Sequence, residues 1–269
     1  MRMEQLYVFG TGNAAATHYY NTCFAIRDEE RFFMVDAGGG NGILRILEDM
    51  NIRFPQIHDI FITHEHTDHL LGIVWMVRFI STRMLNGTYQ GDLNIYCHED
   101  LVPTIDTICR LTLQGKFYKM IGDRIHLIPV HDGETVHIMD YDVTFFDIHS
   151  TKAKQYGFTT TLKGGRKLTC AGDEPYNSLC APYVEGSDWL LHEAFCLYAE
   201  REKFKPYEKH HSTVKDACEL ASQLNIPNLI LWHTEDKSVG HRKELYLAEG
   251  RACYHGNLYI PDDREILDL

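Results

Sequence analysis

The chain has 269 residues, of which 44% are hydrophobic and 24% are charged. This balance excludes disordered and fibrous proteins, and it supplies enough apolar side chains for a large buried core. The formal net charge of −12 disfavours a long nucleic acid as a ligand, because affinity for a phosphate backbone comes mainly from Lys and Arg.

Predicted strands and helices alternate along most of the chain. Short β-rich runs predict strands, and apolar residues at helical spacing predict helices; the first part has strands at 5–9, 22–26, 31–36 and 59–63 and helices at 42–50, 70–84 and 100–113. The stretch 124–171 is mostly strand-like. It is followed by strands at 188–193 and 228–234, a helix at 212–225 and another helix beginning near 241. No low-complexity linker separates these sections, so we expect a single domain over 1–269, built of two similar halves with one shared core.

Cysteine usage and the N-terminal sequence bear on the cellular compartment. The eight cysteines are dispersed and form no C-x-x-C pair, which favours reduced thiols over a disulfide framework. The first residues lack the apolar segment of a signal peptide, and no run of about 18 apolar residues occurs. We therefore expect a cytoplasmic protein with no membrane partner.

The strongest chemical signal is the segment THEHTDH at 63–69, which lies between a predicted strand and a predicted helix. His64 and His66 are two residues apart in an extended chain, so both side chains can point the same way, whereas Asp68 and His69 can turn towards an adjacent position. This spacing suits two neighbouring metal ions better than one. The alternative is a polar loop whose histidines are incidental.

Three more residues of ligand type follow predicted strands, namely His149, Asp173 and His233. Each of them alone would more often be a structural His or a turn Asp. Because binding groups collect at the carboxyl ends of strands in α/β sheets, their common placement favours one shared site.

The H-x-H-x-D-H pattern formed by His64, His66, Asp68 and His69 resembles the hallmark of the metallo-β-lactamase superfamily. The resemblance implies a four-layer αβ/βα metallo-β-lactamase sandwich with two divalent metal ions. It implies that His64, His66 and His149 bind one ion, that Asp68, His69 and His233 bind the other, and that Asp173 bridges them. Nitrogen and oxygen ligands suit zinc, although manganese and iron accept them too.

Secondary motifs are most similar to the ribonuclease Z branch, whose members are tRNA 3′-processing endonucleases. They are VFGTGNAAA at 8–16, AGDEP at 171–175, DWLLHEAF at 188–195, HHST at 210–213 and LILWHTED at 229–236. HHST resembles the G-H-S-T segment of that branch, which implies that His211 assists the leaving group. Only 23 residues lie between His149 and Asp173, which leaves no room for the long basic arm with which ribonuclease Z grips tRNA.

These residues predict a metal-dependent hydrolase in which a metal-bound hydroxide attacks a phosphodiester. Asp68 would orient or deprotonate that water, and His211 would protonate the departing oxygen. His192 and Glu193 would fix a ligand or His211, or else have a structural role. Asp36 is expected to order the metal loop rather than to bind metal.

The segment from Gly10 to Ala15 also fits the dinucleotide-binding pattern G-x-G-x-x-A. Only about ten residues separate these glycines from the next predicted strand, and this is too few for the crossover helix of a parallel βαβ unit. We therefore expect this loop to border the metal cleft instead.

The substrate stays open between an RNA and a small ester, lactone or cyclic phosphodiester. A non-catalytic metal-binding module is the third possibility, but a structural zinc site is normally closed and prefers Cys. The resemblance also implies a homodimer, for which the apolar helix at 70–84 is a candidate surface.

Overall fold

The computed structural model describes residues 4–269, which divide into two compact units. The first unit contains the N-terminal strand β1 (Gln5–Gly10) together with Tyr20–His131 and Arg264–Leu269, and the second contains Thr11–Tyr19 and Asp132–Asp263. Each unit has a seven-stranded mixed sheet within the described residues. This confirms the α/β class, whereas the single domain over 1–269 stays a prediction.

The sheet of the first unit has the strand order β14-β1-β2-β3-β4-β5-β6. Its other strands are β14 (Ile266–Asp268), β2 (Cys23–Asp28), β3 (Arg31–Val35), β4 (Ile57–Phe61), β5 (Leu93–His98) and β6 (Ile125–Val130). Strands β14, β1, β2 and β3 pair antiparallel, and β3 to β6 are parallel. The carboxyl ends of β3 and β4 therefore lie side by side, where the sequence places Asp36 and the 63–69 segment.

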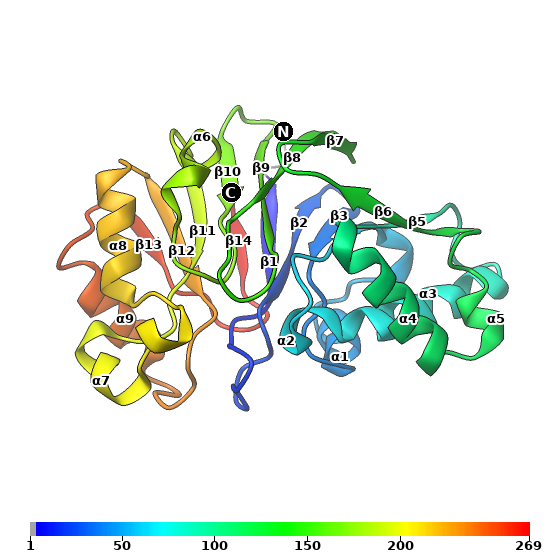
Figure 1. The fold of residues 1–269 in the computed structure, drawn as a ribbon, viewed down its shortest axis with the longest axis horizontal. Helices are drawn as coiled ribbons and strands as arrows, with labels where there is room; N and C mark the ends of the chain where they lie inside the picture. The colour runs from blue at the N-terminus through cyan, green and yellow to red at the C-terminus, as the bar shows by residue number, and fades with distance from the viewer. Residues whose placement is uncertain (1–3) are drawn as a thin grey trace. The chain divides into compact units, whose positions relative to one another are not determined.

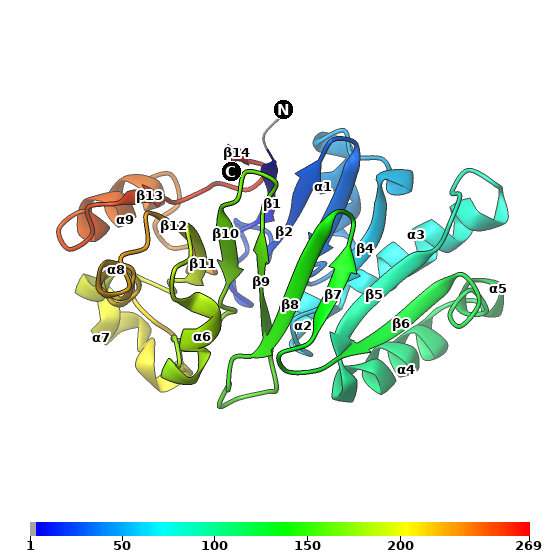
Figure 2. The same ribbon diagram turned by 90° about the horizontal axis from the view of Figure 1, so that it is seen from above.

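Five α-helices belong to this unit within the described residues: α1 (Gly42–Asp49), α2 (Thr67–Leu70), α3 (Gly72–Leu85), α4 (Val102–Thr112) and α5 (Gly115–Tyr118). Figure 2 shows α3 and α4 beside β5 and β6. In α1 the buried residues Ile43, Ile46 and Leu47 have helical spacing, so one face of the helix enters the core. Buried side chains of α1, α3 and α4 form one cluster with residues of β3, β4 and β5.

The predicted helix at 70–84 is interrupted at Leu71, and α2 and α3 meet there. The amide of Gly72 donates to Gly38 O (2.8 Å) instead of continuing the helical pattern. A Cβ on Gly72 would lie 1.9 Å from Ala37 O, so only glycine permits this approach. The interruption thus ties the helix start to the loop that follows β3.

The sheet of the second unit has the order β13-β12-β11-β10-β9-β8-β7. Its strands are β7 (Thr135–Ile138), β8 (Tyr141–Asp147), β9 (Tyr156–Thr161), β10 (Lys167–Cys170), β11 (Trp189–Glu193), β12 (Asn228–Trp232) and β13 (Asn257–Tyr259). Strands β10 to β13 are parallel, while β9 is antiparallel to both β8 and β10. Strands β8, β10, β11 and β12 therefore end at the same edge.

The helices of this unit within the described residues are α6 (Ala181–Val184), α7 (Arg201–Phe204), α8 (Val214–Gln223) and α9 (Arg242–Gly250). Helix α8 packs on β11 and β12, and α9 packs on α8 and β13 (Figure 1). The apolar face of α8, with Val214, Ala217, Cys218 and Ala221, joins a buried cluster with residues of β11 and β12. Thr213 begins the helix as an N-cap and accepts from Asp216 N.

The remaining sequence expectations concern membranes and thiols. No helix in residues 4–269 is both long and apolar enough to cross a membrane. The eight cysteines form no disulfide in the structure, and all except Cys253 are buried.

Candidate metal centre

In the first unit, four residues of ligand type gather in the turn after β4 and in the short helix α2 that follows it. Imidazole rings of His64 and His69 lie 4.2 Å apart between centroids, and Nε2 of His64 lies 2.9 Å from Nδ1 of His66. Nε2 of His69 lies 3.4 Å from Asp68 Oδ2. His64, Asp68 and His69 are buried, so the predicted histidine motif forms one compact cluster.

Asp36 determines which ring nitrogens of this cluster carry protons. Its Oδ2 accepts from Thr63 Oγ1 (2.8 Å) and from His69 Nδ1 (2.7 Å). Because the Thr63 hydroxyl gives its proton to Asp36, it accepts from His64 Nδ1 (2.9 Å). In their neutral form both rings then have the lone pair on Nε2. Asp36 is 4% exposed and has a left-handed backbone, in agreement with the predicted loop-ordering role.

This arrangement fits a bound metal ion. A neutral imidazole binds metal through its unprotonated nitrogen, and its other N–H usually donates to a carboxylate or another oxygen. Two nitrogens on one tetrahedral zinc ion lie about 3.3 Å apart, given Zn–N bonds of about 2.0–2.1 Å. The separation of 2.9 Å between His64 Nε2 and His66 Nδ1 is close to that value.

In the second unit, Asp173 and His233 follow β10 and β12 at the shared sheet edge. His233 Nε2 lies 3.5 Å from Asp173 Oδ2, and both side chains are buried. The predicted convergence of these two residues is therefore observed. His149 follows β8 at the same edge and lines a pocket there, with a left-handed backbone.

His211 and Glu193 form a second pair beside His233. The ring centroids of His211 and His233 are 5.2 Å apart, and His211 stacks on Phe195 at 5.0 Å. His211 Nδ1 lies 3.5 Å from Glu193 Oε2, while Glu193 Oε1 accepts from Ser212 N. Glu193 is fully buried. One ligand-type atom from each of Glu193, His211 and His233 lies within 4.8 Å of the others.

His192, the neighbour of Glu193, has a different environment. Its Nδ1 donates to Glu193 O at 2.7 Å, and its Nε2 has no hydrogen-bond partner among the described residues. The bond to the strand backbone fixes the ring, and of the two residues only Glu193 faces His211.

Two carboxylates that the sequence reasoning missed order the neighbouring loops. Glu174 accepts from Ser150 Oγ (2.8 Å) and Thr151 N (3.1 Å), and so fixes the loop after His149. Asp236 accepts from the amides of Thr17 (2.6 Å) and His18 (3.0 Å). Burial opposes ionisation of Asp236, but these amides and Lys237 hold its pKa well below the usual range. Glu174 and Asp236 each follow a proposed metal ligand within three positions. This proximity in sequence is the signal that could have identified them.

The glycine-rich loop after β1 is not a nucleotide fingerprint. Strands β1 and β2 are antiparallel, and no α-helix lies between them in the described residues. The loop instead contacts the residue after His233: Asn13 N donates to Thr234 O (3.0 Å), and Thr234 N donates to Thr11 O (2.9 Å). Buried Arg242 donates to both threonine hydroxyls.

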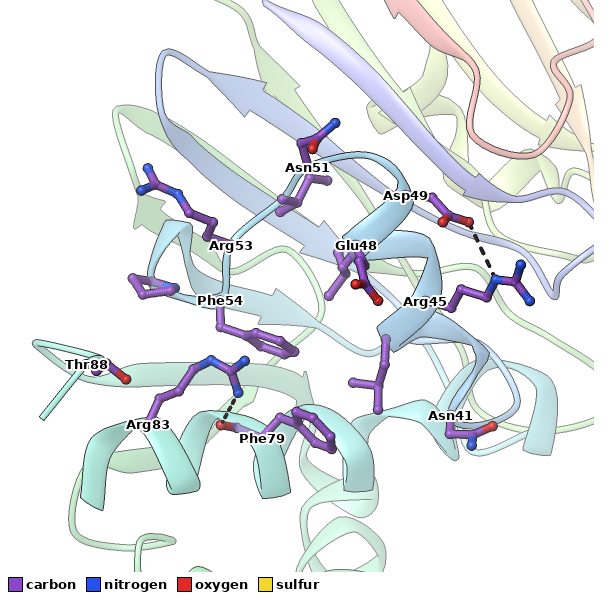
Figure 3. Close-up of a pocket in the computed structure, with 14 residues that line it drawn as sticks. Asn41, Arg45, Glu48, Asp49, Asn51, Arg53, Phe54, Phe79, Arg83 and Thr88 are labelled. Carbon is purple, nitrogen blue, oxygen red and sulfur yellow. Dashed lines mark hydrogen bonds and ion pairs between the residues drawn. The ribbon is translucent and has the colours of Figure 1, made fainter. Parts of the chain in front are cut away.

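A groove of about 1270 Å³ lies elsewhere in the first unit, between α1, α3 and the segment after α1. Figure 3 shows the Arg83 guanidinium over the Phe54 ring, 4.0 Å from its centroid, and Arg83 Nη1 donates to Phe79 O. Arg45 Nε lies 3.9 Å from Asp49 Oδ2. Among the described residues that line this groove there is no His or Cys, so it lacks the donor set of the histidine cluster.

Comparison with known proteins gives a family and several relatives. The family model described as "Anti-Pycsar protein Apyc1" matches residues 4–246. The ribonuclease Z of Phocaeicola vulgatus is 26% identical over 89% of this chain and 91% of its own length. The chain spans almost the full length of that relative.

Solved structures share the fold. The metallo-β-lactamase fold protein YhfI from Bacillus subtilis superposes with a TM-score of 0.79 at 16% identity, over 98% of this chain and 99% of that chain. The short form of human tRNase Z superposes with a TM-score of 0.75 at 20% identity, over 98% of each chain. The predicted metallo-β-lactamase fold is thereby confirmed.

Proposed function

The chain belongs to the anti-Pycsar protein Apyc1 family, and from this membership and its donor residues we propose that it hydrolyses small phosphodiesters at two divalent metal ions. It is a hydrolase of the metallo-β-lactamase superfamily, in the ribonuclease Z-like branch, and its relatives support a metal-dependent phosphodiesterase or nuclease. The single observation that carries the metal assignment is the Asp36 network, which leaves ligand lone pairs on His64 and His69.

The ligand set is the one implied by the sequence motif. His64, His66 and His149 would hold one ion, Asp68, His69 and His233 the other, and Asp173 would bridge the two. The donor set of imidazoles and carboxylates suits zinc best, with manganese or iron as the alternatives. When bound, the ions would supply Lewis acidity towards the phosphate and lower the pKa of a water nucleophile.

The protein side chains would handle the protons. Asp68 would orient or deprotonate the attacking water, and His211 would protonate the departing oxygen. Glu193 supports the second role, because its carboxylate faces His211 Nδ1 at 3.5 Å and would stabilise the protonated ring. Such contacts tighten when substrate binds, so the long distance in the free protein is compatible with the role.

Three observations favour a small substrate over a precursor tRNA. Between the loop that carries His149 and Asp173 the chain forms only β9, a short turn and β10, so this stretch contains no arm. The pocket that His149 lines has a volume of about 420 Å³, within the range of small-molecule sites. The net charge of −12 also opposes a long polyanion.

The decisive experiment compares three substrates with the metal-loaded protein. We expect bis(p-nitrophenyl) phosphate to be hydrolysed with a higher kcat/KM than a five-membered lactone, and precursor tRNA to remain uncut. Faster lactone hydrolysis would instead identify an esterase of small molecules, and specific tRNA cleavage would identify an endonuclease. Fewer than one metal ion bound per chain would support a non-enzymatic role and contradict the proposal.

A matched pair of variants tests the motif itself. Asp68→Ala should lower kcat at least 100-fold because it removes a proposed ligand and proton-handling group. Glu65→Ala lies in the same loop but alters an exposed side chain, so it should keep kcat within about twofold. Equal activity of the two variants would remove Asp68 from the site.

Sedimentation of the same samples would test the homodimer that the resemblance to the ribonuclease Z branch implies.

A further inference from the structure

The pocket of about 420 Å³ at the sheet edge of the second unit has a lining suited to an anion. His149, His210 and His211 line it, together with Tyr176 and Tyr207. Glu174, the one acidic residue among the described residues that line it, is already engaged by Ser150, Thr151 and Lys152. In a chain with a net charge of −12, a concave surface with a single, already paired carboxylate favours a negatively charged ligand.

The backbone of His210, which lines this pocket, has an unusual conformation. It has φ 57° and ψ 50° and ends the short helical turn Tyr207–Lys209. Its amide donates to Tyr207 O (3.2 Å), and the next amide, of His211, donates to Pro206 O (3.0 Å). Glycine is the residue best suited to such a left-handed position. A histidine here keeps a pocket-lining imidazole at the cost of backbone strain.

Thr151 fixes the orientation of the His210 ring. The Thr151 Oγ1 lies 2.9 Å from His210 Nδ1 and 3.5 Å from Glu174 Oε2. A hydroxyl has one proton, and the shorter contact is the better hydrogen bond. With Thr151 as the donor to Nδ1, the ring proton lies on Nε2, where it can be donated to a ligand. Thr151 itself is held by the bond from its amide to Glu174.

We propose that His210 is a substrate-positioning residue, whose Nε2–H donates to a non-bridging phosphate oxygen, with Thr151 holding the ring in place. The role differs from that of His211, which would act on the departing oxygen. The inference rests on the proposed function in naming a phosphodiester as the bound anion. The expected signature is a change in KM, because the contact exists in the bound substrate as well as in the transition state.

Three variants isolate this contact, with exposed His137→Gln on β7 as the control. His210→Gly removes the imidazole and relieves the left-handed backbone, so KM for bis(p-nitrophenyl) phosphate should rise about tenfold with kcat within threefold and no loss of Tm. His210→Gln retains an N–H donor and should recover most of the affinity. Thr151→Val keeps the shape of Thr151 without its hydroxyl and should also raise KM.

A second readout does not depend on turnover. In the metal-free protein, millimolar inorganic phosphate should shift the NMR ring resonances of His210, which are assigned by their loss in His210→Gln. Unmoved resonances, or an unchanged KM in His210→Gly, would overturn the inference, as would a loss confined to kcat. If phosphate shifts the resonances but the metal-loaded wild type hydrolyses no phosphodiester, the proposed function fails while the anion site stands.

Discussion

Replacement of Asp36 by Asn should separate the metal site from the fold around it. The Asp36 Oδ1 accepts from Thr63 N (2.8 Å), and the amide oxygen of Asn can keep this bond. The two bonds at Oδ2, from Thr63 Oγ1 and His69 Nδ1, are lost because an amide NH₂ cannot accept. Asp36→Asn therefore removes the groups that fix the tautomers of both His64 and His69.

The size of the effect follows from the buried position of Asp36. A hydrogen bond to a charged group contributes about 1.5–3 kcal/mol, so the loss of two should lower the free energy of unfolding by about 3 kcal/mol or more. Loss of a carboxylate that orients a ligand histidine typically weakens metal binding about 10–100-fold. Because His64 is a proposed ligand of one ion and His69 of the other, both dissociation constants should rise.

The assay combines urea unfolding of the metal-free protein with zinc competition against a chromogenic chelator. Asp59→Asn is the control, because Asp59 is a buried carboxylate of β4 that accepts from Asn94 Nδ2 (3.0 Å) and Tyr96 Oη (3.2 Å). It should lower stability without altering zinc affinity. If Asp36→Asn binds two zinc ions as tightly as the wild type, the tautomer argument is refuted.

Four further outcomes are expected. His211→Ala should lower kcat about 10²–10⁴-fold with the fold retained, and Glu193→Gln should lower kcat less, because it leaves the imidazole in place. A chelator should abolish activity and zinc should restore it, whereas irreversible loss would argue against a metal enzyme. Burial raises the pKa values of Cys97 and Cys109 to about 12; both thiols should resist DTNB at pH 8. Burial of the two neutral thiols should stabilise the folded protein fully below pH 9, and this stabilisation should fall as the pH rises from 9 towards 12. The midpoint of urea unfolding at each pH measures it. Arg242→Met, which removes a buried guanidinium with four hydrogen bonds, should cost about 3 kcal/mol or more of unfolding free energy.

Local sequence patterns were enough to predict most elements of the fold and the histidine cluster. The spacing of His64 and His66 in an extended segment indicated their convergence, because strand-like backbone places residues two apart on one side. The apolar runs predicted strands β1 to β4, strands β6 to β12 and the longer helices, but they did not predict β5. Strands β13 and β14 have three residues each, too few to show a period.

Contacts between residues distant in sequence set the parts that could not be predicted. Nothing near Asn13 indicates that its loop pairs with Thr234, since this depends on two backbone segments 221 positions apart. The position of the ring proton on His64 depends on the hydrogen bonds of both Thr63 and Asp36. These residues are brought together because β3 and β4 end side by side, which the sequence does not show. Likewise the sequence left open whether Glu193 fixes a ligand, fixes His211 or has a structural role, and its distance of 3.5 Å to His211 favours the second of these.

The route of the chain between the two units has a consequence for biosynthesis. Strand β1 pairs on one side with β2 and on the other with β14, so that Gln5 lies opposite Asp268. A ribosome must therefore complete the entire second unit before the partner for that side of β1 emerges. Until then β1 is an open sheet edge that can pair with strands of other nascent chains. Ribosome-stalled chains ending before Ile266 should accordingly aggregate more readily than the released protein.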